Sequence, residues 1–168
     1  QGHIMTKTTS CPARLLDSET IANIGLYYVC FRLARYGWTV SPATRNAKGA
    51  DLVACSQDAS KTRALQVRAT SRRGPILLAT HLDRVLGDFV VLCRSVLSET
   101  PESFLLTPAE ARAAAVSVEK DGTTSFWLPP RAYDRPEFRE AWLRLGTGVS
   151  PRGLPNPACS GLAQLRRA

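Results

Sequence analysis

The pattern of apolar and polar positions divides the chain into helical and extended segments. The first helical segment begins near Asp17, a cap-type residue, and Glu19 follows at the positive end of the helix dipole. Apolar residues then recur at three- and four-residue spacing as far as Gly37, which suits a helix C-cap. The positions predicted to face a core are Ile21, Ile24, Tyr28, Phe31 and Ala34, and Tyr27 is assigned to the core with them.

Extended segments follow this helix. Residues 38–42 and a strand that opens at Asp51 are predicted to form a hairpin across the 46–49 turn, and the stretch 64–71 is predicted to form the next strand. Residues 89–93 are continuously apolar, which is typical of a strand buried on both faces. After a strand at 104–106, Thr107 and Glu110 have the spacing of a capping box, with a proline between them at the first helical turn.

The remaining segments are shorter. Residues 76–88 are ambiguous, with a short helix or irregular stretch expected around 81–86. Residues 116–119 and 125–128 flank an Asp-Gly turn signal and predict a hairpin, and 136–145 predict a final amphipathic helix. We therefore expect a cloning scar and flexible lead-in over 1–16, one domain over 17–145, and a basic tail rich in glycine and proline over 146–168.

Length and composition agree with one domain built around one core. At 168 residues, with 44% hydrophobic residues, the chain is long enough to bury a core without disulfides or metals. Five cysteines without a C-x-x-C pair argue against a disulfide framework and a zinc cage. No apolar run is long enough for a membrane span, so the expectation is a cytoplasmic protein with no membrane partner. The net charge of +8 favours a polyanionic partner.

Three polar side chains stand out in the second and third strands. Asp51 opens one strand, and Gln66 and Arg68 lie two residues apart on the next, so the pleat directs both to one face. A solvated sheet face and a functional site explain this pattern equally well on the strands alone. In the second case the carboxylate, the amide and the guanidinium would meet at one edge of the sheet.

These segments carry a resemblance to a known family. The helix sequence IGLYYV at 24–29, the strand GADLVA at 49–54 and the strand LQVR at 65–68 resemble motifs of the PD-(D/E)XK nuclease superfamily, in its small bacterial restriction-endonuclease-like branch. The resemblance covers about residues 20–145. It implies a restriction-endonuclease-like central mixed β-sheet flanked by helices, to which the C-terminal hairpin and helix are added.

The resemblance also implies a site. Asp51, Gln66 and Arg68 fall on the catalytic positions, and Asp51, Gln66 and the Val67 carbonyl fall on those of the ligands for Mg²⁺ or Mn²⁺. Two departures reduce this site. Leu26 stands where the branch has a helix glutamate, and Arg68 replaces a lysine, although a guanidinium cannot act as a general base. Asp51 is then the one certain anion, unless Glu19 reaches the site instead of only complementing the helix dipole.

Two functions of different classes therefore remain. The first is metal-dependent hydrolysis of phosphodiesters in DNA, favoured over RNA, with Mg²⁺ or Mn²⁺ as cofactor. The second is a catalytically inactive, cofactor-free module of the same fold that binds nucleic acid or a protein partner, in a larger defence-type complex or as a homodimer. In either case the predicted phosphate contacts are Arg45, Lys48, Arg72 and Arg73. A third, wholly structural hypothesis makes the hairpin and tail an assembly surface.

Overall fold

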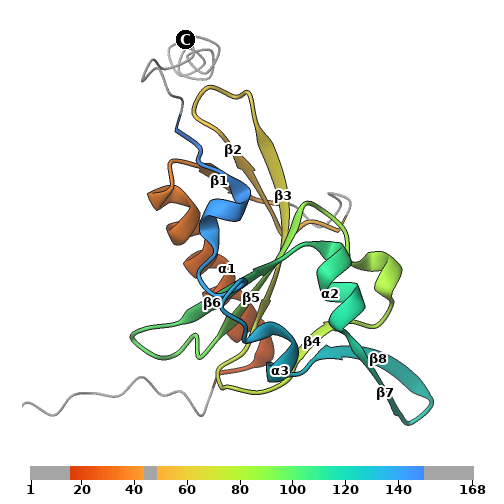
Figure 1. Ribbon diagram of the computed structural model, residues 1–168. Helices are drawn as coiled ribbons and strands as arrows, with labels where there is room; N and C mark the ends of the chain where they lie inside the picture. Colours follow the sequence, from red (N-terminus) through yellow and green to blue (C-terminus); the bar gives the residue numbers. More distant parts are fainter. Residues whose placement is uncertain (1–15, 44–48, 150–168) are drawn as a thin grey trace, which may run out of the picture.

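The computed structural model describes residues 16–43 and 49–149, which form two β-sheets and a few helices (Figure 1). The larger sheet has the strand order β1-β2-β3-β5-β6. Strands β3 and β5 are parallel and every other neighbouring pair is antiparallel, so the sheet is mixed. Its strands are β1 (Thr39–Pro42), β2 (Leu52–Cys55), β3 (Thr62–Ala69), β5 (Phe89–Arg94) and β6 (Glu102–Leu106). The expected α/β class and mixed central sheet are confirmed.

Helix α1 (Ser18–Arg35) covers one face of this sheet. The Asp17 side chain accepts a hydrogen bond from the Thr20 amide at 2.7 Å, as expected for an N-cap. The buried positions are Ile21, Gly25, Val29 and Leu33. The predicted face is therefore wrong in part: Ala34 is exposed, and the side chains of Tyr27 and Phe31 are 66% and 56% exposed.

Glycine sets the contact face of α1. A Cβ atom on Gly25 would lie 2.3 Å from the Cβ of Ala69 in β3, so the helix backbone approaches the sheet where neither residue has a large side chain. This close approach places Val29 and Leu33 over the sheet and rotates the aromatic side of the helix outward. A search for large apolar residues does not detect a contact made by two small ones.

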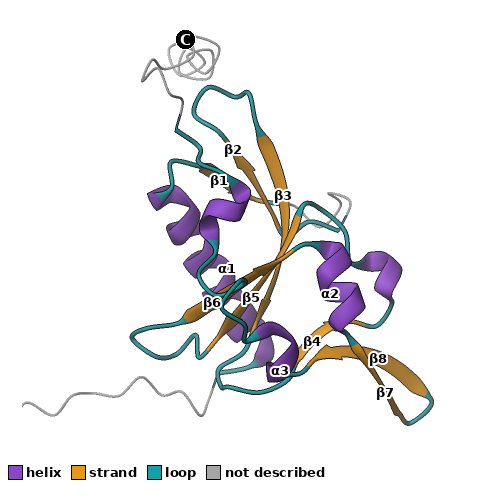
Figure 2. Ribbon diagram, viewed as in Figure 1, coloured by secondary structure: helices purple, strands orange, loops and turns teal. Residues whose placement is uncertain are grey.

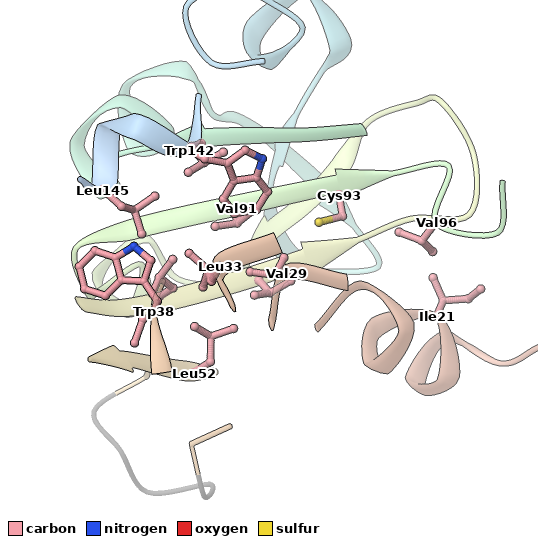
Figure 3. Packing of buried hydrophobic residues seen from close by; sticks show 14 residues of the cluster. Ile21, Val29, Leu33, Trp38, Leu52, Val91, Cys93, Val96, Trp142 and Leu145 are labelled. Carbon is pink, nitrogen blue, oxygen red and sulfur yellow. The ribbon is translucent and has the colours of Figure 1, made fainter. Parts of the chain in front are cut away.

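Strand β5 lies between two hydrophobic layers, as its apolar run predicts. Val91 and Cys93 pack toward α1 with Trp38 and Leu52, and Figure 3 shows the side chains of this layer. Val90 and Leu92 instead pack against the opposite cluster, which includes residues of α2 (Pro108–Ala114). The capping box at the start of α2 is confirmed, with its two hydrogen bonds at 3.2 and 2.7 Å between Thr107 and Glu110.

A second sheet has the strand order β4-β8-β7. Its strands are β4 (Ile76–Ala79), β8 (Thr123–Leu128) and β7 (Val116–Lys120), all antiparallel. The predicted hairpin is confirmed as β7 and β8, and Figure 2 shows it projecting from the rest of the chain. The ambiguous 76–88 segment forms β4 and a short 3-10 helix, η1 (Leu82–Arg84).

The predicted amphipathic helix over 136–145 is wrong. This region contains α3 (Pro130–Tyr133), which precedes it, and a 3-10 helix η2 (Trp142–Leu145) at its end. The segment between them follows the open edge of β6, where the Leu105 amide donates to Phe138 O at 2.9 Å and the Glu140 amide to Ser103 O at 2.8 Å. Phe138 joins one hydrophobic layer and Trp142 joins the other, so the chain passes around the sheet edge instead of lying on one face.

Much of the predicted lead-in and tail lies outside the described residues. Within 16–43 and 49–149, none of the helices combines the length and apolar character needed to cross a bilayer.

Candidate functional site

Asp51 and Arg68 meet at the junction of β2 and β3. Asp51 immediately precedes β2, and the antiparallel register that pairs Leu52 with Leu65 brings it beside the middle of β3. Asp51 Oδ2 accepts hydrogen bonds from the Val67 amide at 2.7 Å and from Arg68 Nη1 at 3.0 Å. The prediction that the carboxylate and the guanidinium lie together agrees with this geometry.

The Arg68 guanidinium is fixed by three oxygen atoms. Besides Asp51, Nη1 donates to the Val67 carbonyl at 2.8 Å, and Nε donates to the Leu78 carbonyl of β4 at 2.9 Å. One nitrogen atom therefore bridges Asp51 Oδ2 and Val67 O. The side chains of Arg68 and Asp51 remain 29% and 40% exposed, so this ion pair is accessible to a ligand.

Gln66 shares the sheet face of Arg68 but serves other partners. The side chain is buried, and its Nε2 donates to the carbonyls of Gly49 at 2.5 Å and Arg84 at 2.9 Å. These bonds tie the loops before β2 and before β5 to β3. Gln66 Oε1 is buried and has no hydrogen-bond partner among the residues that the structure describes. Gln66 thus organises the surrounding loops, and the predicted convergence of all three side chains holds only for Asp51 and Arg68.

A cavity of about 810 Å³ opens beside the ion pair. Helix α1 contributes Leu26 to the wall of this cavity, which Asp51 also lines. Leu26, which stands where the resembling family has a glutamate, therefore faces the same cavity as Asp51. Neither Glu19 nor Gln66 lines it. The other side is formed by the second sheet. The residues that line the cavity include Ala22, Asn23, Leu26, Asp51, Val67, Arg68, Leu77 and Trp127.

The donor set of this cavity does not fit a divalent cation. Mg²⁺ needs oxygen ligands at about 2.0–2.1 Å, and the predicted set is Asp51, Gln66 and the Val67 carbonyl. Two of those oxygens already share Arg68 Nη1 as their donor, so a fixed positive charge stands between them. In the ranges 16–43 and 49–149, no three His, Cys, Asp or Glu side chains group closely enough to hold a metal ion. The guanidinium therefore donates to two of the three side-chain or carbonyl groups that were expected to hold the metal.

The predicted phosphate contacts have different surroundings. Arg45 and Lys48 lie outside the described residues. Arg73 is exposed, and its Nη2 donates to Asp134 at 2.8 Å, a carboxylate that it shares with Arg94 and Arg139. Arg72 is exposed, and its side chain has no acidic partner within the described part of the chain.

Positive charge is distributed unevenly along the chain. All 14 acidic residues fall in the described ranges, whereas seven of the 22 basic residues do not. The described part thus carries 15 basic residues against 14 acidic ones. The basic character indicated by composition comes mainly from segments outside it: Lys7, Arg14, Arg45, Lys48, Arg152, Arg166 and Arg167.

Sequence reasoning missed Trp127 as a site residue. The alternation of β8 places Trp127 and Ser125 on one face and Phe126 on the other, but the alternation does not indicate that this face meets the cavity. That contact depends on β4, which brings Leu77 opposite Trp127.

Comparisons of the chain with models of protein families, with curated proteins and with solved structures gave no match.

Proposed function

We propose that this chain is a nucleic-acid-binding module with a nuclease-like fold, in which Arg68 and not a metal ion supplies the positive charge of the site. The observation that carries the proposal is the position of Arg68 Nη1, which is 3.0 Å from Asp51 Oδ2 and 2.8 Å from Val67 O. A guanidinium held there binds a phosphate oxygen without a metal, and it does not activate a water molecule as a metal ion does.

The site retains the chemistry for phosphate binding. A guanidinium stays protonated at every physiological pH, and its planar array of donors matches phosphate. Arg68 Nη2 has no acceptor within the described ranges, whereas Nε and Nη1 are fixed by protein oxygens. A phosphate in the cavity can accept from Nη2 while the other donors keep the group in place. Because Asp51 offsets part of the charge, we expect modest affinity from this site alone.

The resemblance to nucleases supplies the competing function. A metal-dependent nuclease would need the guanidinium to leave Asp51 and Val67 before a cation could bind there. Asp51 Oδ1 accepts no hydrogen bond from the described residues, so one oxygen of the carboxylate would be accessible to such a cation. Hydrolysis that depends on Mg²⁺ or Mn²⁺ is therefore the outcome against which the proposal is tested.

The first test measures binding of fluorescent DNA oligonucleotides by anisotropy, in MgCl₂ and in EDTA. We expect equal affinity in both, and an affinity about tenfold weaker for Arg68→Gln, because one hydrogen bond to a charged group is lost. The double variant Asp51→Asn/Arg68→Gln preserves the net charge and should be weakened as well. Arg63→Gln, on the same strand, is the matched control, because the one hydrogen bond of the Arg63 guanidinium among the described residues is to the Thr62 carbonyl.

The second test measures cleavage of the same DNA and of a supercoiled plasmid with Mg²⁺ and Mn²⁺. We expect no product from the wild type. A metal-dependent product that disappears in Asp51→Asn would overturn the proposal in favour of the nuclease. The double variant Leu26→Glu/Arg68→Lys places a second carboxylate in the cavity and removes the planar guanidinium, so it is the variant in which we expect cleavage to appear.

A further inference from the structure

The outer face of the second sheet carries a row of apolar side chains beside the Arg68 cavity. Leu77 of β4 and Val116 of β7 both lie opposite Trp127 of β8, so the three side chains cross the sheet in one line. Leu77 and Val116 are 41% and 43% exposed, and Val118 on the same face is 44% exposed. Exposed apolar groups gathered on one sheet face are typical of a binding surface.

Trp127 connects this row to the proposed site. It lines the cavity that contains Arg68, and it also lines a neighbouring hollow of about 380 Å³. Valines of β7 form part of that hollow, and Pro75 borders both spaces. A ligand that extends from Arg68 along the surface would therefore pass over the indole ring.

The polar atom of the indole ring is already satisfied. Trp127 Nε1 donates to Ser125 Oγ at 2.9 Å, and Ser125 Oγ donates to the Val118 carbonyl at 3.3 Å. These bonds connect the partly buried ring to β7 through Ser125, so the chemistry that the ring offers to a ligand is its π surface. Stacking of a planar, unpaired nucleobase uses that surface and tolerates any base.

Basic residues border the row on both sides. Arg68 lies in the first cavity, and Lys120 and Arg131 line the second hollow. Neither Lys120 nor Arg131 forms an ion pair within the described part of the chain. An apolar aromatic surface between positive charges is complementary to a base that has a phosphate on either side.

We propose that single-stranded DNA occupies this face, with one phosphate at Arg68, an adjoining base stacked on Trp127 and a further phosphate near Lys120 and Arg131. This inference rests on the proposed function and adds the substrate class. Paired bases in a duplex hide their faces, so an unpaired strand is the form that can stack. In the hollow, the Ser125 hydroxyl is already engaged, so it is not available there to recognise a 2′-hydroxyl.

The test uses the full chain and a labelled oligodeoxythymidine of about 15 nucleotides, with its duplex form as a second ligand. We expect Trp127→Leu to weaken single-strand binding roughly 5- to 150-fold, the range for removing one stacked base, and to leave duplex binding unchanged. Trp127→Phe keeps a smaller ring and should retain most of the affinity. Tyr27→Leu is the matched control, because Tyr27 is an aromatic residue, 66% exposed, on α1.

A second measurement works on the unmodified protein. The other two tryptophans, Trp38 and Trp142, are 3% and 1% exposed, so quenching of indole emission by a bound base reports mainly on Trp127. We expect the oligonucleotide to quench this emission with the same midpoint as the anisotropy titration. The proposed phosphate contact of Lys120 is tested by Lys120→Gln, which should weaken binding of the oligonucleotide. Lys61→Gln, which removes an exposed lysine away from this face, should leave that binding unchanged.

The outcomes separate this inference from the proposed function. If Arg68→Gln weakens binding but Trp127→Leu does not, and the emission is not quenched, the stacking inference is wrong and the phosphate site stands. If only Trp127→Leu weakens binding, the phosphate site is wrong. The wild type could also self-associate in the absence of nucleic acid and become monomeric in Trp127→Leu. That result would show that a second copy of the chain covers this face, and it would overturn the inference.

Discussion

Removing the Arg68 guanidinium should convert a site that is indifferent to metal into one that binds it. For Mg²⁺ or Mn²⁺ to ligate both Asp51 Oδ2 and Val67 O, Arg68 Nη1 must leave both atoms. Hydrogen bonds to a charged group contribute about 1.5–3 kcal/mol each, and the lower value applies because the pair is partly exposed. The displacement then costs about 3 kcal/mol, which weakens metal affinity roughly 10²-fold.

Thermal unfolding detects this difference. In Arg68→Met, Mn²⁺ at ten times its dissociation constant should add about 1.4 kcal/mol to the free energy of unfolding. For a chain of this length that is a rise in Tm of about 3–6 °C. The wild type, with an affinity roughly 10²-fold weaker, should shift by less than about 0.5 °C at the same concentration.

The assay compares Tm with and without metal within each variant, with NaCl added to equalise ionic strength, so a change in baseline stability does not affect the result. Arg63→Met on the same strand should behave as the wild type, because Arg63 does not contact Asp51. The reasoning fails if the wild-type Tm rises with Mn²⁺ along a saturation curve and Asp51→Asn abolishes the rise.

Two further predictions concern the framework of the site. Gly25→Ala should lower the free energy of unfolding by about 1–3 kcal/mol in urea titrations, because the new methyl group would lie 2.3 Å from Ala69 Cβ. The double variant Gly25→Ala/Ala69→Gly should recover part of this loss. An unchanged urea midpoint for Gly25→Ala would contradict the close approach of helix and sheet. Arg94 is 3% exposed, and its guanidinium donates hydrogen bonds to Glu102 and Asp134. These bonds hold the pKa of each carboxyl below its usual value. Both carboxylates therefore contribute stability at neutral pH, and this stability is lost as pH falls through the lowered pKa. The destabilisation caused by Arg94→Met should therefore be largest near pH 7 and shrink between about pH 5 and pH 2, and a difference that is constant with pH would contradict this assignment.

Short-range signals in the sequence were sufficient for several elements. Thr107 and Glu110 form their capping box within one helical turn, and the Asp121-Gly122 turn needs only residues that tolerate positive φ, which both adopt. The continuous apolar run of β5 predicted burial on both faces, because no polar residue within it could face solvent. In each case the deciding interactions lie within a few residues.

The polar site was predictable only in part. Strand alternation placed Gln66 and Arg68 on one face, and the antiparallel pairing of β2 with β3 brought Asp51 beside that strand. The hydrogen bonds of Gln66 to Gly49 and Arg84 could not be foreseen, because those carbonyls belong to loops whose positions depend on the packing of other strands. The inclusion of Trp127 depends in the same way on β4, which the sequence left ambiguous.

The sequence by itself therefore determined the positions along the chain of most strands and helices, the burial of β5 on both faces and the types of chemical group available. Tertiary structure decided which groups meet. The small residues Gly25 and Ala69 set the face of α1, and the open edge of β6 drew the chain around it in place of a final helix. Above all, the fold placed the Arg68 guanidinium between two oxygens. Local patterns do not encode that position, because it depends on a carboxylate, a strand carbonyl and β4 converging from separate parts of the chain.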